Sequence, residues 1–101
     1  MGWLRYGSSA VAEIEDVELA HLRAAIRGCF AAGRGFSLSI RLRGSKGSAA
    51  VLWMHPSIPV TYAFTHPALD TLDVGWVSRM TMAARSETGM VAIAYRIAAE
   101  P

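Results

Sequence analysis

A proline corner divides one apolar stretch of this chain into two. Residues 51–65 read VLWMHPSIPVTYAFT, and the segment HPSIP at 55–59 separates the two apolar runs. Proline has no amide hydrogen to donate to a sheet, so a strand that reaches this segment must end there. The pattern therefore predicts two core strands, at 49–54 and 60–65, joined by a rigid turn.

Alternation of apolar and polar side chains predicts the other strands. The clearest lies at 36–43, where Phe36 and every second residue after it are apolar and the residues between them are polar. One apolar and one polar face are typical of an antiparallel sheet that is covered on one side. Shorter strands are predicted at 3–6 and 10–14. A last strand is predicted at 90–97, with an apolar face formed by Val91, Ile93, Tyr95 and Ile97.

The segment 17–32 has the spacing of a helix that is buried along one side. An apolar stripe recurs there at steps of three and four residues, whereas His21, Arg23 and Arg27 fall at its edge or away from it. The carboxylate of Asp16 is suited to cap the free amides of the first turn. The stripe consists of Leu19, Leu22, Ile26, Cys29 and Phe30.

A second helix is predicted in the last third of the chain. Asp70 or Asp73 can supply its cap, and the apolar spacing that follows ends near Ser86. With this helix the predicted order of elements is β-β-α-β-β-β-α-β. Mostly antiparallel strands with two separate helices make an α+β fold, a two-layer sandwich. The 101 residues suit a single domain that spans 1–101.

The balance of apolar and charged residues indicates a partner. Apolar residues make up 52% of the chain and charged ones 18%, below the roughly 25% that is typical of globular domains. A monomer of this composition has little polar surface with which to cover its apolar side chains, so we expect a homo-oligomer, most simply a dimer. The beginning of the chain lacks the apolar core of a signal peptide, and no apolar run reaches the roughly 18 residues that cross a membrane. A cytoplasmic location without a membrane partner is expected.

Charge is distributed unevenly, although the net charge is only +2. No acidic residue occurs between Leu19 and Leu69, and most of the cationic side chains lie in that region. Two interpretations remain open. The cationic residues form a solvated face that pairs with Glu13, Glu15 or Glu18, or they form a site for nucleic acid or phosphate. The residues of that candidate site are Arg23, Arg27, Arg34, Arg41, Arg43 and Lys46.

No set of catalytic or metal-ligating residues can be recognised. The histidines, at 21, 55 and 66, are too far apart in sequence to form a metal-binding motif, so neither a metal nor another cofactor is predicted. Cys29 falls in the apolar stripe and is interpreted as a packed side chain. Ser57 is interpreted as a turn residue, although a small enzyme that uses His55 with a carboxylate stays as an alternative. The cis or trans state of the bonds before Pro56, Pro59 and Pro67 is left open.

The aromatic residues follow strand and helix spacing. Aromatic side chains on a sheet can stack on nucleic-acid bases. At these spacings they are interpreted instead as core residues. They are Trp53, Tyr62, Phe64 and Trp76.

Four segments in fixed order carry a resemblance to a known family. GWLRYG at 2–7, DVELAHL at 16–22, LWMHPSIP at 52–59 and WVSRMTMAARSETGM at 76–90 resemble a family of bacterial proteins of about this length and of unassigned function, often labelled ATP-dependent DNA ligases. Such a ligase carries AMP on the lysine of a KxDG motif, whereas Lys46, the only lysine here, lies in KGSA. The resemblance therefore implies at most an accessory module in DNA transactions, and it supplies no catalytic residue. Its signature turn consists of His55, Pro56, Ser57 and Pro59.

Overall fold

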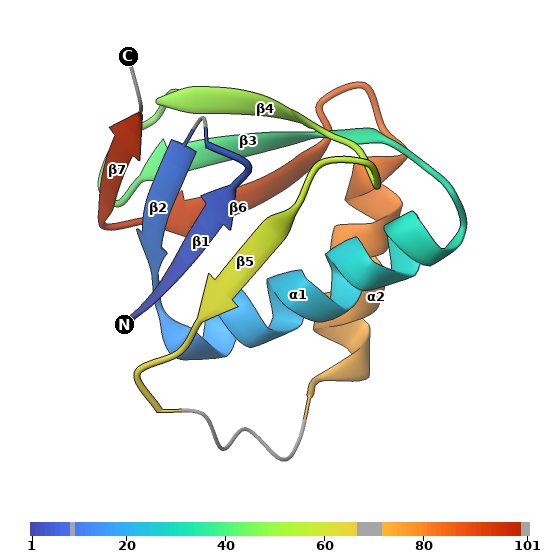
Figure 1. Ribbon diagram of the computed structural model, residues 1–101, viewed down its shortest axis with the longest axis horizontal. Helices are drawn as coiled ribbons and strands as arrows, with labels where there is room; N and C mark the ends of the chain where they lie inside the picture. Colours follow the sequence, from blue (N-terminus) through green and yellow to red (C-terminus); the bar gives the residue numbers. More distant parts are fainter. Residues whose placement is uncertain (9, 67–71, 100–101) are drawn as a thin grey trace.

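The fold consists of two sheets and two helices. It is described by a computed structural model, which covers residues 1–8, 10–66 and 72–99 (Figure 1). The predicted α+β class and order of elements are confirmed, with the last predicted strand divided at Tyr95 into two. The elements are β1 (Gly2–Tyr6), β2 (Ala10–Ile14), α1 (Asp16–Ala31), β3 (Phe36–Leu42), β4 (Ala50–Met54), β5 (Val60–Ala63), α2 (Val74–Ala84), β6 (Met90–Ala94) and β7 (Arg96–Ala99).

The strands form a four-stranded and a three-stranded sheet. The first has the order β5-β1-β2-β7 and is antiparallel throughout, and the second has the order β4-β3-β6, in which β6 runs parallel to β3. The two sheets are linked where the chain bends between β6 and β7. At this bend the Tyr95 amide donates to the Glu13 carbonyl oxygen at 2.8 Å. The bend lets one stretch of sequence pair with both sheets.

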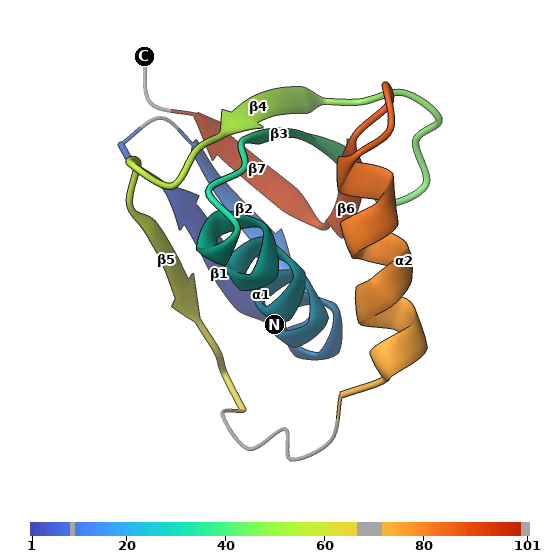
Figure 2. The ribbon, with the colours of Figure 1, turned by 90° about the vertical axis from the view of Figure 1, so that its right-hand side faces the viewer.

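The core lies between the sheets and around α1. In Figure 2, α1 is seen nearly end-on, with β5 on one side, α2 on the other and the three-stranded sheet above. The predicted stripe of α1 is confirmed: four of its residues are buried and Phe30 packs partly buried against them. The largest fully buried side chains are Leu4, Ile14, Leu19, Leu22, Ile26, Leu38, Ile40, Met54 and Met90.

His21 joins the two helices, although the sequence places it at the edge of the stripe or beyond. Its side chain is buried and stacks on Trp76, with ring centroids 4.1 Å apart. Its Nδ1 lies 2.7 Å from the Val17 carbonyl oxygen, and its Nε2 accepts the Asp73 amide at 2.8 Å. A carbonyl can only accept and an amide can only donate, so these contacts specify the neutral ring with its proton on Nδ1. Histidine thereby satisfies both polar atoms inside the core.

The predicted cap of α1 is wrong and that of α2 is right. The N-cap of α1 is Glu15, and it makes no side-chain capping hydrogen bond. Asp16 instead accepts the amides of Thr65 and His66, at 3.2 and 3.0 Å, because the end of β5 comes within reach of its carboxylate. Asp73 caps α2 by accepting the Trp76 amide at 3.1 Å. Asp70 lies outside the described residues.

Asp16 gives the fold a dependence on pH. Desolvation acts to raise its pKa, but the two amide hydrogen bonds, together with the N-terminal ammonium 3.6 Å away, outweigh it and hold the pKa below the ordinary value of 3.8. Since the folded-state pKa is lowered, the carboxylate stabilises the fold above pH 3.8, and this contribution is lost as pH falls through the folded-state pKa. Asp16→Asn is expected to lower the free energy of unfolding by about 1–2 kcal/mol at neutral pH.

The difference in the free energy of unfolding between the wild type and Asp16→Asn should become smaller in acid, because the wild-type carboxyl is then protonated and as neutral as the asparagine amide. Urea unfolding of both proteins at neutral pH and at about pH 2, well below the ordinary pKa of 3.8, measures it. Glu87→Gln, an exposed substitution outside this contact, serves as the control and should change neither value. An equal loss at both pH values would contradict the role of the charge.

The buried face of β6 differs from the predicted one. Met90, Ala92 and Ala94 are buried, whereas Val91 is half-buried and Ile93 is 37% exposed. Parallel pairing sets Met90 beside Leu38 and so turns this face toward the core. Both faces of the strand are apolar, and the small alanines take the crowded side. Met90 is the one large side chain of β6 on the buried side, and Val91 and Ile93 are left outside.

Candidate functional site

The HPSIP corner is a hydrogen-bonded turn on the surface. Nδ1 of His55 accepts the Ser57 amide at 3.1 Å and lies 2.7 Å from the Ser57 Oγ. Since the amide donates, Nδ1 carries no proton, and the serine hydroxyl donates to it as well. The Ile58 amide donates to the His55 carbonyl oxygen at 3.0 Å, and Gly7 donates to Pro59 at 2.8 Å. The corner is therefore tied both to itself and to the β1–β2 turn.

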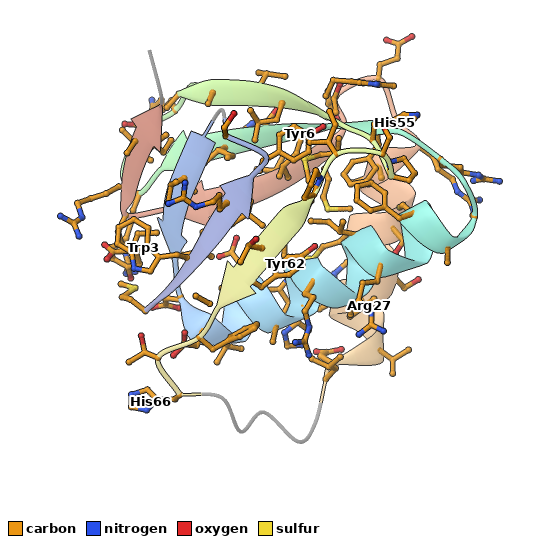
Figure 3. The ribbon with its side chains drawn as sticks, in the orientation of Figure 1. Trp3, Tyr6, Arg27, His55, Tyr62 and His66 are labelled. Atoms are coloured by element: carbon orange, nitrogen blue, oxygen red, sulfur yellow. The ribbon has the colours of Figure 1, made fainter. Side chains whose placement is uncertain are left out.

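The turn residues are exposed, except for half-buried Ile58. The bonds before Pro56 and Pro59 are trans, and Pro67 lies outside the described residues. No described carboxylate forms a hydrogen bond with His55, so the described residues supply a serine–imidazole pair without a third group to orient it. Figure 3 shows His55 and His66 at opposite ends of β5. Within the described ranges, no three His, Cys, Asp or Glu residues converge in a manner suited to a metal.

The six cationic residues predicted as one site occupy three places. Arg23 and Arg27 lie on the exposed side of α1, where the Arg23 guanidinium stands 5.2 Å from the centre of the Phe64 ring. Arg34 precedes β3, whereas Arg41 lies near the far end of that strand, roughly 20 Å away at strand spacing. Arg41, Arg43 and Lys46 therefore form one group at the end of β3, and Arg23 and Arg27 form a second group on α1.

Arg43 is held by neighbouring side chains rather than left free. Its guanidinium lies 3.8 Å from the Glu15 carboxylate, donates to the Tyr95 hydroxyl and stands 5.0 Å from the centre of that ring. The Tyr95 hydroxyl in turn donates to Glu15 at 3.0 Å. Desolvation and this hydrogen bond raise the pKa of Tyr95. The expected pairing with an early acidic residue holds for Arg43, and it ties β3 to the β6–β7 bend.

Two other acidic residues named as partners bind elsewhere. Glu13 forms a two-pronged hydrogen bond with Arg96, both contacts at 3.2 Å. Glu18 accepts the Ile93 amide at 2.8 Å, and burial raises its pKa in spite of that hydrogen bond. Arg41 and Lys46 are exposed, and neither has a described carboxylate within ion-pair distance.

Sequence reasoning missed the outer face of the three-stranded sheet. Trp53 is predicted as a core residue, but it is 61% exposed, and Val51 is 63% exposed. Tyr6, from the other sheet, donates its hydroxyl to the Trp53 carbonyl oxygen, which fixes the backbone while the indole faces outward. The strand reads AVLWM, so both of its faces are apolar and no polar residue marks the outside.

The other three aromatic residues are confirmed as part of the core. Tyr62, Phe64 and Trp76 are partly buried and pack against the main cluster. Burial raises the pKa of Tyr62 to about 12, although Arg23 and Arg27 lie near enough to oppose the rise. These side chains serve packing, and Trp53 is the exception.

The apolar residues on the outer face of the three-stranded sheet lie on its two outer strands and flank polar residues of β3, of which Ser39 is buried and Ser37 half-buried. Val51 pairs with Ser39 and Ser39 with Val91, while Trp53 pairs with Ser37. No described helix lies over the β4 part of this side, which is uppermost in Figure 2, whereas Val91 and Ile93 on β6 line a shallow hollow with residues of α2. The surface, called the Trp53 face below, consists of Ser37, Ser39, Arg41, Val51, Trp53, Val91 and Ile93.

Comparison with known proteins places nearly the whole chain in one family. A family model described as a domain of unknown function (DUF7882) matches residues 1–95. No curated protein and no solved structure matches the chain. The description of the family names no activity, so the ligase label carried by the resemblance receives no support from it. Among the described residues, no helix is both long and apolar enough to cross a membrane.

Proposed function

The chain belongs to this family of domains of unknown function, and we propose that it is a non-enzymatic interaction module that binds a second copy of itself through the Trp53 face. The observation that carries the proposal is the exposure of Trp53 and Val51, 61% and 63%, on the uncovered side of a sheet. Contiguous apolar side chains outside a core are typical of interaction surfaces.

The shape of the Trp53 face favours a second copy as its partner. Two apolar rows, Val51 with Trp53 and Val91 with Ile93, flank a central strand that carries the small residues Ser37 and Ser39. Two such faces related by a two-fold axis can each set the indole ring of Trp53 over the serines of the other. The same patch then serves both partners, as an isologous interface requires.

The charges on this face also favour self-association. None of the strands β3, β4 and β6 contains an acidic residue, and Arg41 is the one cation within them. The strands therefore bring no carboxylate of their own into the interface, although the Glu18 carboxylate lies beside Ile93 at the β6 edge, and the exposed Arg41 stands at the end of β3. Since the net charge is only +2, long-range repulsion between two copies is weak.

Two lysines on the Trp53 face test the proposal. The wild type is expected to sediment as a dimer at tens of micromolar, and the double variant Val51→Lys, Trp53→Lys as a monomer with at least about tenfold weaker association. The reason is that the introduced lysines of the two copies would repel each other. They would also lose water against the apolar residues of the partner copy. The control, Thr61→Lys with Ala63→Lys, adds the same charge at exposed positions of β5 and should remain a dimer.

Circular dichroism checks that both variants fold. A wild type that sediments as a monomer at tens of micromolar would refute self-association. Equal dissociation of both double variants would show that net charge, rather than the Trp53 face, controls assembly.

Nucleic-acid binding is the second candidate. It is favoured by Arg41 and Lys46, which are exposed and lack a described carboxylate partner. The case for nucleic-acid binding is weakened because Arg34, Arg23 and Arg27 lie apart from the β3–β4 hairpin that carries Arg41 and Lys46. Fewer phosphate contacts mean a weaker and less salt-dependent complex, so self-association stands first.

A further inference from the structure

A cavity opens where the C-terminal ends of the two helices meet the start of β3. Both helix ends lie toward the right of Figure 1. The cavity measures about 400 Å³, and its wall is partly apolar and partly polar. Its main lining residues are Cys29, Arg34, Phe36, Thr81, Ala84 and Arg85. A space of this size is within the range of small-molecule sites.

The two arginines of this cavity are not used by the fold. Neither Arg34 nor Arg85 forms an ion pair with a described carboxylate. Neither guanidinium donates a hydrogen bond to another described residue; only the backbone amides of Arg34 and Arg85 do, to the Cys29 and Met82 carbonyl oxygens at 3.0 and 3.1 Å. Both guanidiniums are therefore available at one opening.

The buried Cys29 thiol in the wall of the cavity is close enough to both arginines to be affected by their charges. Burial raises its pKa, and the charges of Arg85 and Arg34 act in the opposite direction. Two cations thus act on one buried atom of the cavity wall. Thr81 donates its hydroxyl hydrogen to the Val77 carbonyl oxygen at 2.9 Å, so it offers no donor to a ligand and the two arginines are the charged donors of the cavity.

We propose that this cavity binds a small organic anion, a carboxylate or a phosphate ester that carries an apolar group. The planar guanidiniums match the oxygens of either acid, and they hold them by charge-assisted hydrogen bonds. Phe36 and Ala84 supply the apolar wall for the rest of the ligand. The arginines and the thiol of this site lie outside the Trp53 face, although Gly35 in its lining adjoins the Trp53 ring, so the thiol assay below is run at submicromolar protein, where association is minimal.

Cys29 is the only cysteine of the chain, so its modification measures access to the cavity. Two aromatic disulfides serve as probes: dithiobis(nitrobenzoate), which carries carboxylates, and dithiodipyridine, which is neutral. In both, the thiolate attacks one sulfur and releases the other half as a coloured thiolate or thione. Arg34→Gln and Arg85→Gln are each expected to slow the anionic probe about three- to tenfold relative to the neutral one at low salt. Arg5→Gln, on β1 and outside the cavity, should leave the ratio of rates unchanged.

Competition identifies the ligand class. Phenyl phosphate or benzoate at millimolar concentration should protect Cys29 from the neutral probe, and protection should fall in both arginine variants. If only phenyl phosphate or only benzoate protects Cys29, the site is assigned to a phosphate ester or to a carboxylate, respectively. Inorganic phosphate, as a third competitor, shows how much of the binding depends on the apolar group. Equal slowing of both probes in the arginine variants, an equal effect of Arg5→Gln, or no protection by any anion would overturn the proposal.

Discussion

Replacement of Met54 by alanine is expected to destabilise the fold by about 3–4 kcal/mol. Met54 closes β4 and is fully buried, and it pairs with Phe36 across the sheet. Its removal takes a large thioether side chain out of the core and leaves a cavity, since the surrounding strands cannot collapse into the space. Both the lost transfer energy and the cavity contribute to this loss.

The neighbouring residue should behave very differently. Trp53→Ala removes a larger side chain, but that side chain is mostly in water and passes close to Gly35, where a Cβ would stand 2.8 Å from Cζ2 of the ring. The expected loss is about 1 kcal/mol, because little apolar area returns to water. Urea unfolding at submicromolar protein, where association is minimal, compares the two variants. A greater loss for Trp53→Ala than for Met54→Ala would mean that the two faces of β4 are exchanged.

This contrast marks what the sequence could predict about the strands. Period-two alternation located β3 within one residue, and the prolines set the end of β4. Alternation assigns a buried face only where the other face is polar, as in β3. In β4 and β6 both faces are apolar, so the choice depends on which side meets the helices, and that is a property of the whole fold.

Local spacing was also insufficient for the charged residues. The position of Asp16 before a helix indicates a cap, but its actual partners, Thr65 and His66, are about 50 residues away. Arg43 and Glu15 meet for the same reason, since the β6–β7 bend brings both to Tyr95. The distribution of cations along the chain was visible, whereas their separation into three places follows from the length of β3 and the direction of α1.

The cavity has no counterpart in any sequence pattern. Arg34 and Arg85 are 51 positions apart, as their numbers show, and each follows a different helix. Only the packing of α1 against α2 brings the two helix ends to one opening. A search for helix C-termini followed by arginine could have drawn attention to both residues, but it could not have shown that they share a cavity.

Gly89 is expected to be the least tolerant position of the turn between α2 and β6. Its φ of +75° lies in the left-handed region, and a Cβ there would stand 2.5 Å from the Ser37 carbonyl oxygen and 2.9 Å from the Ser37 Cβ. Ser37 belongs to the central strand of its sheet, which is held by β4 on one side and by β6 on the other, so its backbone cannot withdraw without loss of pairing. Gly89→Ala should therefore lower the free energy of unfolding by about 3–5 kcal/mol, the sum of backbone strain and steric conflict.

Gly33 separates the two causes. Its φ of +74° is nearly the same, but a Cβ at this position would meet nothing within 4 Å. Gly33→Ala should cost only the backbone strain, about 1–2 kcal/mol. The difference between the two variants in urea unfolding then measures the contact with Ser37 alone. If the two losses are equal, the α2–β6 turn does not approach β3 this closely, and the parallel placement of β6 beside β3 would have to be reconsidered, because Met90, which follows Gly89, pairs with Leu38 of β3.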